Sequence, residues 1–124
     1  MPHRILVIDD APDLALVMRM LLERAGHEVI SAESGRRGLR LFFEDRPDLV
    51  VLDLRMPELD GWETLERLRD LSDVPVLMYS GTKPTREQLE RLRPELDAFQ
   101  PKPARGPEIV TQVSELLDAA CSAA

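Results

Sequence analysis

The chain has 124 residues, 44% hydrophobic but only 4% aromatic, and a formal net charge of −7. This length predicts a single domain over residues 1–124, with a core built mainly from aliphatic side chains. The negative charge disfavours direct binding to nucleic acid, because neutralising phosphates supplies most of that affinity. The apolar stretches are too short for a signal peptide or a membrane span, and the single Cys121 excludes an internal disulfide framework. We therefore expect a cytoplasmic domain that does not contact membranes.

Three short apolar runs, at residues 5–8, 49–52 and 74–79, are continuous rather than alternating. Such runs are typical of strands covered on both faces, as in a parallel sheet between two layers of helices. Weaker strands are predicted at residues 27–32 and 98–100.

Segments with helical spacing of apolar residues separate these strands. The predicted helices cover 13–25, a segment that opens at Ser34 or Gly35 and ends at Pro47, 62–71, 85–93 and 107–120. Strands and helices alternate five times, so short right-handed connections give a doubly wound α/β sandwich. The residues expected to face the sheet are Leu14, Val17, Met18, Leu21 and Leu22 in the first helix, Leu39, Phe42 and Phe43 in the second, and Trp62, Leu65 and Leu68 in the third.

Charged and polar residues directly follow four of the five strands. Asp9 and Asp10 follow the first strand, Asp53 the third, Ser80 the fourth and Lys102 the fifth. In open α/β sheets, ligands bind outside the carboxyl ends of the strands, where these side chains would meet. The acidic pair by itself could equally cap the next helix. Three carboxylates in one crevice, however, repel one another unless a cation lies among them, and oxygen ligands alone favour Mg²⁺ over Mn²⁺ or Ca²⁺.

A magnesium ion held by few carboxylates usually serves a phosphate. Lys102 would supply a positive charge to that phosphate and Ser80 a hydrogen-bond donor. A carboxylate that took the phosphoryl group would become an aspartyl-phosphate. The metal and the lysine would then neutralise charge in a loose, in-line transition state.

Four segments resemble the receiver domain of two-component response regulators, in particular single-domain regulators of the chemotaxis type. They read ILVIDD at 5–10, LDLRMPELDG at 52–61, YSG at 79–81 and FQPKP at 99–103. The segments stand in the family's order with its separations, and the resemblance covers essentially the whole chain. It implies a flavodoxin-like fold, with a five-stranded parallel sheet of order 2-1-3-4-5 and helices on both faces.

The resemblance also implies a role for each of the acidic residues. Asp53 would accept a phosphoryl group from the phosphohistidine of a histidine kinase or histidine phosphotransferase. Asp10 would bind Mg²⁺ directly and Asp9 chiefly through water, with Asp53 and the carbonyl group of Arg55 completing the metal site.

Three further residues receive roles from the resemblance. Lys102 would pair with the phosphoryl oxygens, Ser80 would move to hydrogen-bond the phosphoryl group, and Phe99 would swing inward behind it. The bond between Lys102 and Pro103 is predicted to be cis, because X-Pro bonds isomerise at little cost and the bend would aim the Lys102 amine into the crevice.

Two positions depart from the family's common pattern. Arg55 is a bulky cation where smaller or uncharged residues are frequent. Pro94 and Glu95 stand where a Gly-Ala pair is often found, so the fourth helix could end early or be distorted.

The leading hypothesis is a phosphorylation-dependent signalling module, monomeric or weakly dimeric, that acts on an unidentified downstream protein. It would be no enzyme beyond its own aspartate phosphorylation and dephosphorylation. The alternative within the family is the receiver fragment of a longer regulator with a DNA-binding output domain. A haloacid-dehalogenase-type phosphatase is disfavoured because Ala11 stands where its second Asp belongs. A flavin mononucleotide binder is disfavoured because the acidic residues after the first strand would repel phosphate.

The first helix carries more apolar residues than one core stripe needs. Leu16 and Met20 lie one turn apart on a different side from that stripe, on a helix that begins beside the acidic crevice. Exposed apolar residues rimmed by polar ones often mark interaction sites. We therefore expect the phosphodonor to dock on this side of the helix.

Overall fold

The structure of the protein is a computed structural model, which describes residues 3–123. Its five strands form one parallel sheet in the order β2-β1-β3-β4-β5, which confirms the predicted topology. The strands are β1 (Arg4–Ile8), β2 (Glu28–Ala32), β3 (Leu49–Leu52), β4 (Val76–Ser80) and β5 (Asp97–Pro101).

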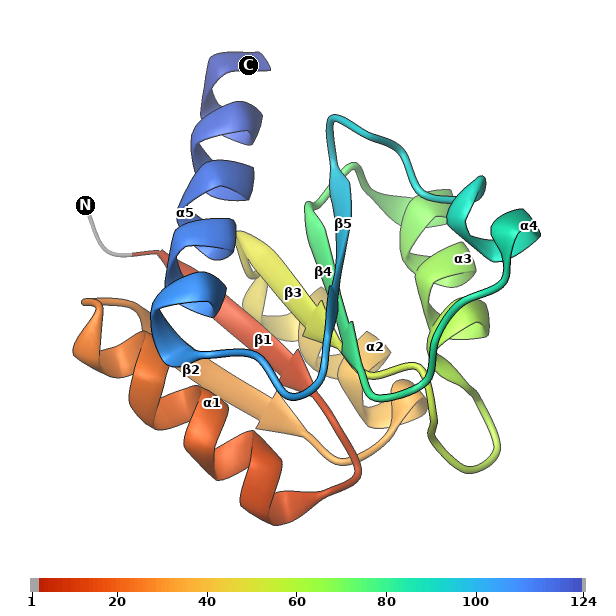
Figure 1. The fold of residues 1–124 in the computed structure, drawn as a ribbon, viewed down its shortest axis with the longest axis horizontal. Coiled ribbons are helices and arrows are strands. Elements are labelled where there is room, and N and C mark those ends of the chain that lie inside the picture. Colours follow the sequence, from red (N-terminus) through yellow and green to blue (C-terminus); the bar gives the residue numbers. More distant parts are fainter. Residues whose placement is uncertain (1–2, 124) are drawn as a thin grey trace.

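Helices cover both faces of the sheet, as predicted. They are α1 (Pro12–Arg24), α2 (Gly35–Asp45), α3 (Gly61–Leu71), α4 (Arg86–Leu89) and α5 (Gly106–Ala123). Figure 1 shows α1 and α5 together on one face, with α2 and α3 on the other. None of the helices described here is long and apolar enough to cross a membrane.

The core has two halves because successive side chains of a strand point to opposite faces of the sheet. Leu6 and Ile8 of β1 join the apolar cluster beneath α2 and α3. Ile5 and Val7 of the same strand join the cluster beneath α1 and α5. The stripe predicted for α3 is confirmed, since Trp62, Leu65 and Leu68 are all buried.

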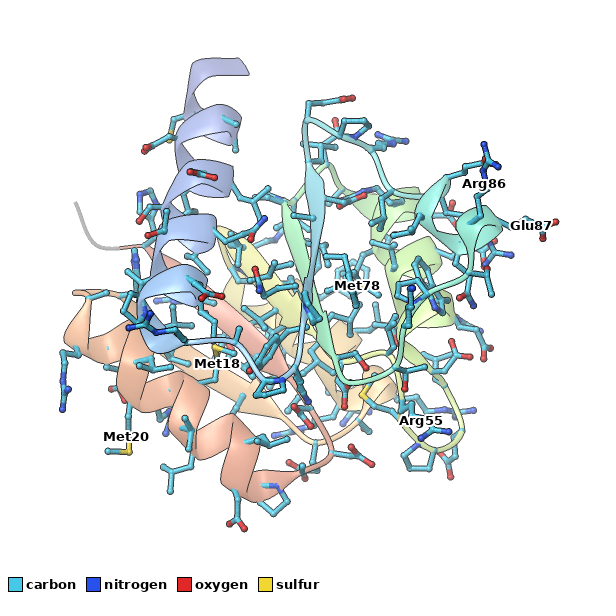
Figure 2. The ribbon with its side chains drawn as sticks, viewed as in Figure 1. Met18, Met20, Arg55, Met78, Arg86 and Glu87 are labelled. Carbon is cyan, nitrogen blue, oxygen red and sulfur yellow. The ribbon has the colours of Figure 1, made fainter. Side chains whose placement is uncertain are left out.

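The sheet-facing stripe of α1 is narrower than predicted. Met18 and Leu22, one turn apart, are buried, whereas Leu14 and Val17 are exposed, so their prediction as sheet-facing residues is wrong. Residues four apart share one helix face, and α1 lies against β2, β1 and α5 along only that face. Figure 2 shows the result, with Met18 turned toward the sheet and Met20 pointing away from the molecule.

A second correction concerns α2. Phe42 is buried, but Phe43 is exposed, although both were predicted to face the sheet. Adjacent residues on an α-helix point about 100° apart, and in α2 only the side that carries Phe42 is covered by the core beneath it.

The fourth helix is much shorter than the predicted span of 85–93. Thr85 begins α4 with a capping box to Gln88, and the helix ends at Leu89 after a single turn. Pro94 disfavours helix for the residue before it and cannot donate a backbone hydrogen bond. The expectation that the helix ends early is confirmed, although it ends at Leu89, five residues before Pro94.

Candidate functional site

The parallel register brings the predicted site residues to one edge of the sheet. Ile8 of β1 is paired with Leu52 of β3, so the next residues, Asp9 and Asp53, are neighbours. The Asp53 backbone N–H donates to the Ile8 carbonyl group at 3.0 Å. On the other side, the Lys102 backbone N–H donates to the Ser80 carbonyl group at 3.0 Å. The loops that follow these strands gather at the bottom of Figure 1.

The three predicted acidic residues come together. One carboxylate oxygen from each of Asp9, Asp10 and Asp53 can be chosen so that all lie within 4.8 Å of one another. Asp9 and Asp53 are buried, and Asp10 is exposed at the mouth of the site. This arrangement offers hard oxygen ligands at a position open to solvent, which suits a magnesium ion that retains several waters.

Lys102 reaches into the same cluster, as predicted. Its Nζ lies 3.2 Å from Asp9 Oδ2 and 3.7 Å from Asp53 Oδ2. The bond between Lys102 and Pro103 is cis, which confirms that prediction. Three carboxylates and one ammonium group leave two negative charges uncompensated, so a divalent cation would balance the site.

Burial is the largest influence on the pKa of Asp9, and it raises that pKa. The charge of Asp53 raises it further. A hydrogen bond from the Ala11 backbone N–H at 2.9 Å and the nearby Lys102 ammonium group act in the opposite direction but do not cancel the effect of burial. Burial therefore destabilises the charged form of Asp9, and a bound cation would stabilise it.

Ser80 and Phe99 lie on the neighbouring strands β4 and β5, and their switch role stays a prediction. Ser80 is buried at the end of β4, and its Oγ accepts a hydrogen bond from the Thr82 backbone N–H at 3.2 Å. Phe99 is half-buried on β5 and packs against the core cluster beneath α2 and α3.

Sequence reasoning assigned no role to Tyr79, although it is part of one matched segment. The Lys102 Nζ lies 5.2 Å from the centroid of the Tyr79 ring, and the Tyr79 hydroxyl accepts a hydrogen bond from the Ala104 backbone N–H at 3.4 Å. Tyr79 therefore holds both the lysine side chain and the loop that carries it. In the sequence, an aromatic residue near the end of a buried strand does not by itself indicate such a contact.

Gly61, the first residue of α3, lies directly against the backbone of the acidic site. A Cβ at this position would overlap the carbonyl oxygen of Asp53 and the Cα of Leu54. The Gly61 backbone N–H also donates to the Leu54 carbonyl group at 2.9 Å. The start of α3 thus packs directly against the backbone that carries Asp53.

Arg55 lies on the exposed loop after β3, as Figure 2 shows. Its backbone N–H is 3.4 Å from Asp53 Oδ1. An open hollow of about 420 Å³ beside the site is lined by Asp10, Leu54, Arg55, Met56, Pro57 and Asp60. The metal-ligand role of the Arg55 carbonyl group stays a prediction.

Residues 5–114 match the response regulator receiver domain family. Together with the sheet order and the acidic cluster, this match shows that the chain belongs to that family. It is a receiver domain of the two-component signalling type, and receiver domains of this family typically use Mg²⁺.

Two curated relatives are more than a third identical to this chain over the aligned residues. The response regulator MprA of Mycolicibacterium vanbaalenii is 38% identical over 118 residues, which are 94% of this chain and 51% of that protein. The uncharacterized transcriptional regulatory protein YrkP of Bacillus subtilis is 37% identical over 113 residues, 91% of this chain and 48% of that protein. The chain thus spans about half the length of the curated relatives it matches.

Solved structures agree on the fold. The receiver domain of Francisella response regulator 1452 has a TM-score of 0.85 and 28% identity, covering 95% of this chain and 98% of that one. A CheY-like receiver domain protein from Methanospirillum hungatei has a TM-score of 0.91 over the whole of both chains. Its 24% identity supports likeness of fold alone.

Proposed function

We propose that Asp53 is the phosphoacceptor of this receiver domain and that Asp9, Asp10 and Asp53, with the Arg55 carbonyl group, hold Mg²⁺. The observation that carries the proposal is the geometry around the Asp53 carboxylate. It is buried, it lies 3.7 Å from the Lys102 ammonium group, and it shares a cluster with two further carboxylates. A lysine and a metal cluster beside one buried carboxylate suit transfer of a phosphoryl group to that carboxylate.

In the proposed reaction, a carboxylate oxygen of Asp53 attacks the phosphorus atom of a phosphohistidine. The new O–P bond forms as the N–P bond breaks, and the imidazole nitrogen keeps the electron pair of that bond. Lys102 stays beside the transferred group and pairs with its oxygens. Bound Mg²⁺ supplies additional positive charge beside the same oxygens.

The same proposal assigns the response of the domain to Ser80 and Phe99. The Ser80 hydroxyl accepts a hydrogen bond from the Thr82 backbone N–H. Ser80 lies on β4, which is paired with β5, the strand that carries Phe99. A hydrogen bond from Ser80 to the phosphoryl group would draw this edge of the sheet inward and open space for the Phe99 ring. The contact surface changed in this way would be read by a downstream protein.

Intact mass after incubation with acetyl phosphate and Mg²⁺ tests the assignment of Asp53. The wild-type chain should gain one phosphoryl group, and Asp53→Asn should gain none. Asp70→Asn, which removes an exposed carboxylate of α3, is the matched control and should be labelled like the wild type. Labelling that persists in Asp53→Asn would place the acceptor elsewhere.

The exposed face of α1 is the proposed docking surface for the histidine kinase or phosphotransferase. We call this surface the α1 patch; it consists of Leu14, Leu16, Val17 and Met20, which are 42–56% exposed. A hollow of about 340 Å³ is lined by both Leu16 and Asp9, so the patch leads directly to the acidic site. Four exposed apolar residues on one helix are more than scattered surface residues would account for.

The double variant Leu16→Ser with Met20→Ser tests the docking proposal. Phosphotransfer from a cognate phosphohistidine donor should slow about tenfold or more, equivalent to ~1.4 kcal/mol. Labelling by acetyl phosphate and thermal stability should stay near wild type, because both side chains are exposed. The double variant Phe43→Ser with Leu71→Ser removes equally exposed apolar residues from α2 and α3 and should transfer normally. Equal slowing in both double variants would contradict the α1 patch as the docking surface.

The remaining expectations are also part of the proposal. Residues 1–124 would form one receiver domain, monomeric or weakly dimeric, in the cytoplasm, where the exposed free Cys121 suits a reducing environment. The alternative is a receiver fragment of a DNA-binding regulator, since the matched relatives are about twice as long as this chain. An immunoblot of the source cells would separate the two, because the chain itself has a mass of 14.0 kDa.

A further inference from the structure

The short α4 leaves the chain between residues 90 and 96 without regular structure, and this segment is tied to α3 by side chains. Asp97, at the start of β5, is buried and forms an ion pair with Arg69 of α3. The other Asp97 carboxylate oxygen, Oδ2, accepts a hydrogen bond from the Arg93 backbone N–H at 3.0 Å. The Arg93 side chain contacts Asp73, with 3.2 Å between Nη1 and Oδ1. The segment is therefore anchored at its end, near Arg93, rather than continued as a helix.

A cavity of about 350 Å³ lies between this segment and α3. Its volume falls at the lower end of the range of about 300–1,000 Å³ that is usual for small-molecule sites. It shares no lining residue with the hollows that contain Asp9 and Asp10. The cavity is lined by Trp62, Leu65, Glu66 and Arg69 of α3 and by Arg91 and Arg93 of the segment.

The lining combines an apolar floor with basic walls. Trp62 and Leu65 are buried in the core, and their side chains form the apolar part of the cavity lining. Three arginines stand against one glutamate in the lining. Within residues 3–123, Arg91 has no ion-pair partner, and the buried Nε of Arg69 has no hydrogen-bond partner. The ion pair of Arg93 with Asp73 is exposed, so it holds the Arg93 guanidinium group only weakly.

We propose that this cavity binds a small aromatic carboxylate. The ring would lie against Trp62 and Leu65, and the carboxylate would be held by Arg91 and Arg93, whose planar guanidinium groups suit it. A single negative charge fits better than several, because Asp97 already neutralises Arg69 and because Glu66 also lines the cavity and would repel a polyanion. The site is independent of phosphotransfer, so it can be tested on unphosphorylated, metal-free protein.

Two-dimensional amide–proton NMR spectra, recorded during titration with para-fluorobenzoate, test the proposal. Trp62 is the only tryptophan of the chain, so its indole N–H signal is assigned without ambiguity. This signal and the backbone signals of residues 91–93 should shift together and saturate at physiological ionic strength. Para-fluorobenzyl alcohol, which has the same ring without the charge, should bind about fivefold more weakly or worse.

Matched variants locate the charge that matters. Arg91→Gln and Arg93→Gln should each weaken para-fluorobenzoate binding about fivefold or more, since each removes one charge-assisted hydrogen bond. Arg86→Gln removes an arginine of α4 that is outside the cavity, points outward in Figure 2 and is almost fully exposed, so it should bind like the wild type. Thermal unfolding of each variant verifies that it is folded.

Three outcomes would overturn the proposal. The Trp62 signal could fail to shift or to saturate. The neutral alcohol could bind as tightly as the carboxylate, or Arg86→Gln could weaken binding as much as the two cavity variants, in which case the attraction is not specific to this cavity. None of these outcomes bears on phosphorylation of Asp53, which intact mass tests separately.

Discussion

The carboxyl edge of β1 and β3 and the segment from α4 to β5 are built in opposite ways. At the first, Asp9 and Asp53 follow two paired central strands, and backbone hydrogen bonds at 3.0 Å fix both positions. At the second, one helical turn is followed by residues without regular structure, and side chains such as Asp97 hold the backbone in place. Position is set by the sheet in one region, and by turn hydrogen bonds together with a few side chains in the other.

This contrast teaches where substitutions in a receiver domain are tolerated. The edge that carries Asp9 and Asp53 keeps its geometry as long as β1 and β3 pair, because their hydrogen bonds fix the position of the residue that directly follows each strand. The α4 segment depends instead on turns and on a few side chains such as Asp97, so we expect single substitutions there to change its shape. Regions held by individual side chains are therefore the ones expected to distinguish this receiver from its relatives.

The largest effect is expected from Asp97→Ala. Removal of one partner from a buried ion pair leaves the other charge uncompensated, which costs about 3–5 kcal/mol in free energy of unfolding. Here it would leave Arg69 buried and also remove the acceptor of the Arg93 backbone N–H. Urea unfolding measures the loss, and Arg69→Leu combined with Asp97→Leu should recover part of it.

Glu90→Ala is the control for that prediction, because its pair with Arg86 lies on the exposed surface of α4. Its effect should stay below about 0.5 kcal/mol. If Asp97→Ala cost no more than Glu90→Ala, the α4 segment would not be held by side chains, and the contrast between the two regions would fail.

A smaller loss is expected from Gly61→Ala at the acidic edge. The new methyl group would overlap the Asp53 backbone, so we expect a destabilisation of about 1–3 kcal/mol and slower labelling by acetyl phosphate. Gly81→Ala, in the loop after β4, places its Cβ 3.9 Å from the Lys102 side chain and should keep wild-type stability. Normal stability and labelling in Gly61→Ala would mean that the Asp53 backbone is not fixed by its contact with α3.

The smallest effect concerns the charge of Asp9. Its pKa is raised above the ordinary value of 3.8, mainly by burial, so the native state binds this proton more readily than the unfolded chain. The resulting penalty is absent below that ordinary value and grows as the pH rises through the native pKa. Asp9→Asn should therefore be modestly more stable than the wild type at neutral pH without metal, and thermal unfolding across pH should show the difference disappearing in acid.

Magnesium should make the wild type more stable than Asp9→Asn. A bound cation favours the charged carboxylates, so Mg²⁺ should stabilise the wild type more than it stabilises Asp9→Asn. Asp10→Asn should lose more Mg²⁺ affinity than Asp9→Asn if Asp10 is the direct ligand and Asp9 acts chiefly through water. Isothermal titration of both variants measures this, and equal losses would contradict the assignment of the two residues.

The sequence by itself determined the fold class and the membership of the acidic site. Continuous apolar runs predict buried parallel strands, and parallel strands bring whatever follows them to one edge. The positions of Asp9, Asp10, Asp53, Ser80 and Lys102 directly after such strands are therefore enough to predict that they meet. The local sequence pattern is sufficient there because the pairing of parallel strands fixes where the residues that follow them lie.

Only the tertiary structure decided which apolar residues are covered and which small contacts hold the site. Leu14 and Val17 have helical spacing suitable for a core, yet they are exposed because no other element packs against that side of α1 within the described residues. The Tyr79 contact to Lys102 and the Arg69–Asp97 pair join elements that are distant along the chain, and Gly61 contacts the Asp53 backbone across the loop between β3 and α3. Periodicity records which face of a helix is apolar, but not how much of that face a neighbouring element reaches, so these features depended on packing.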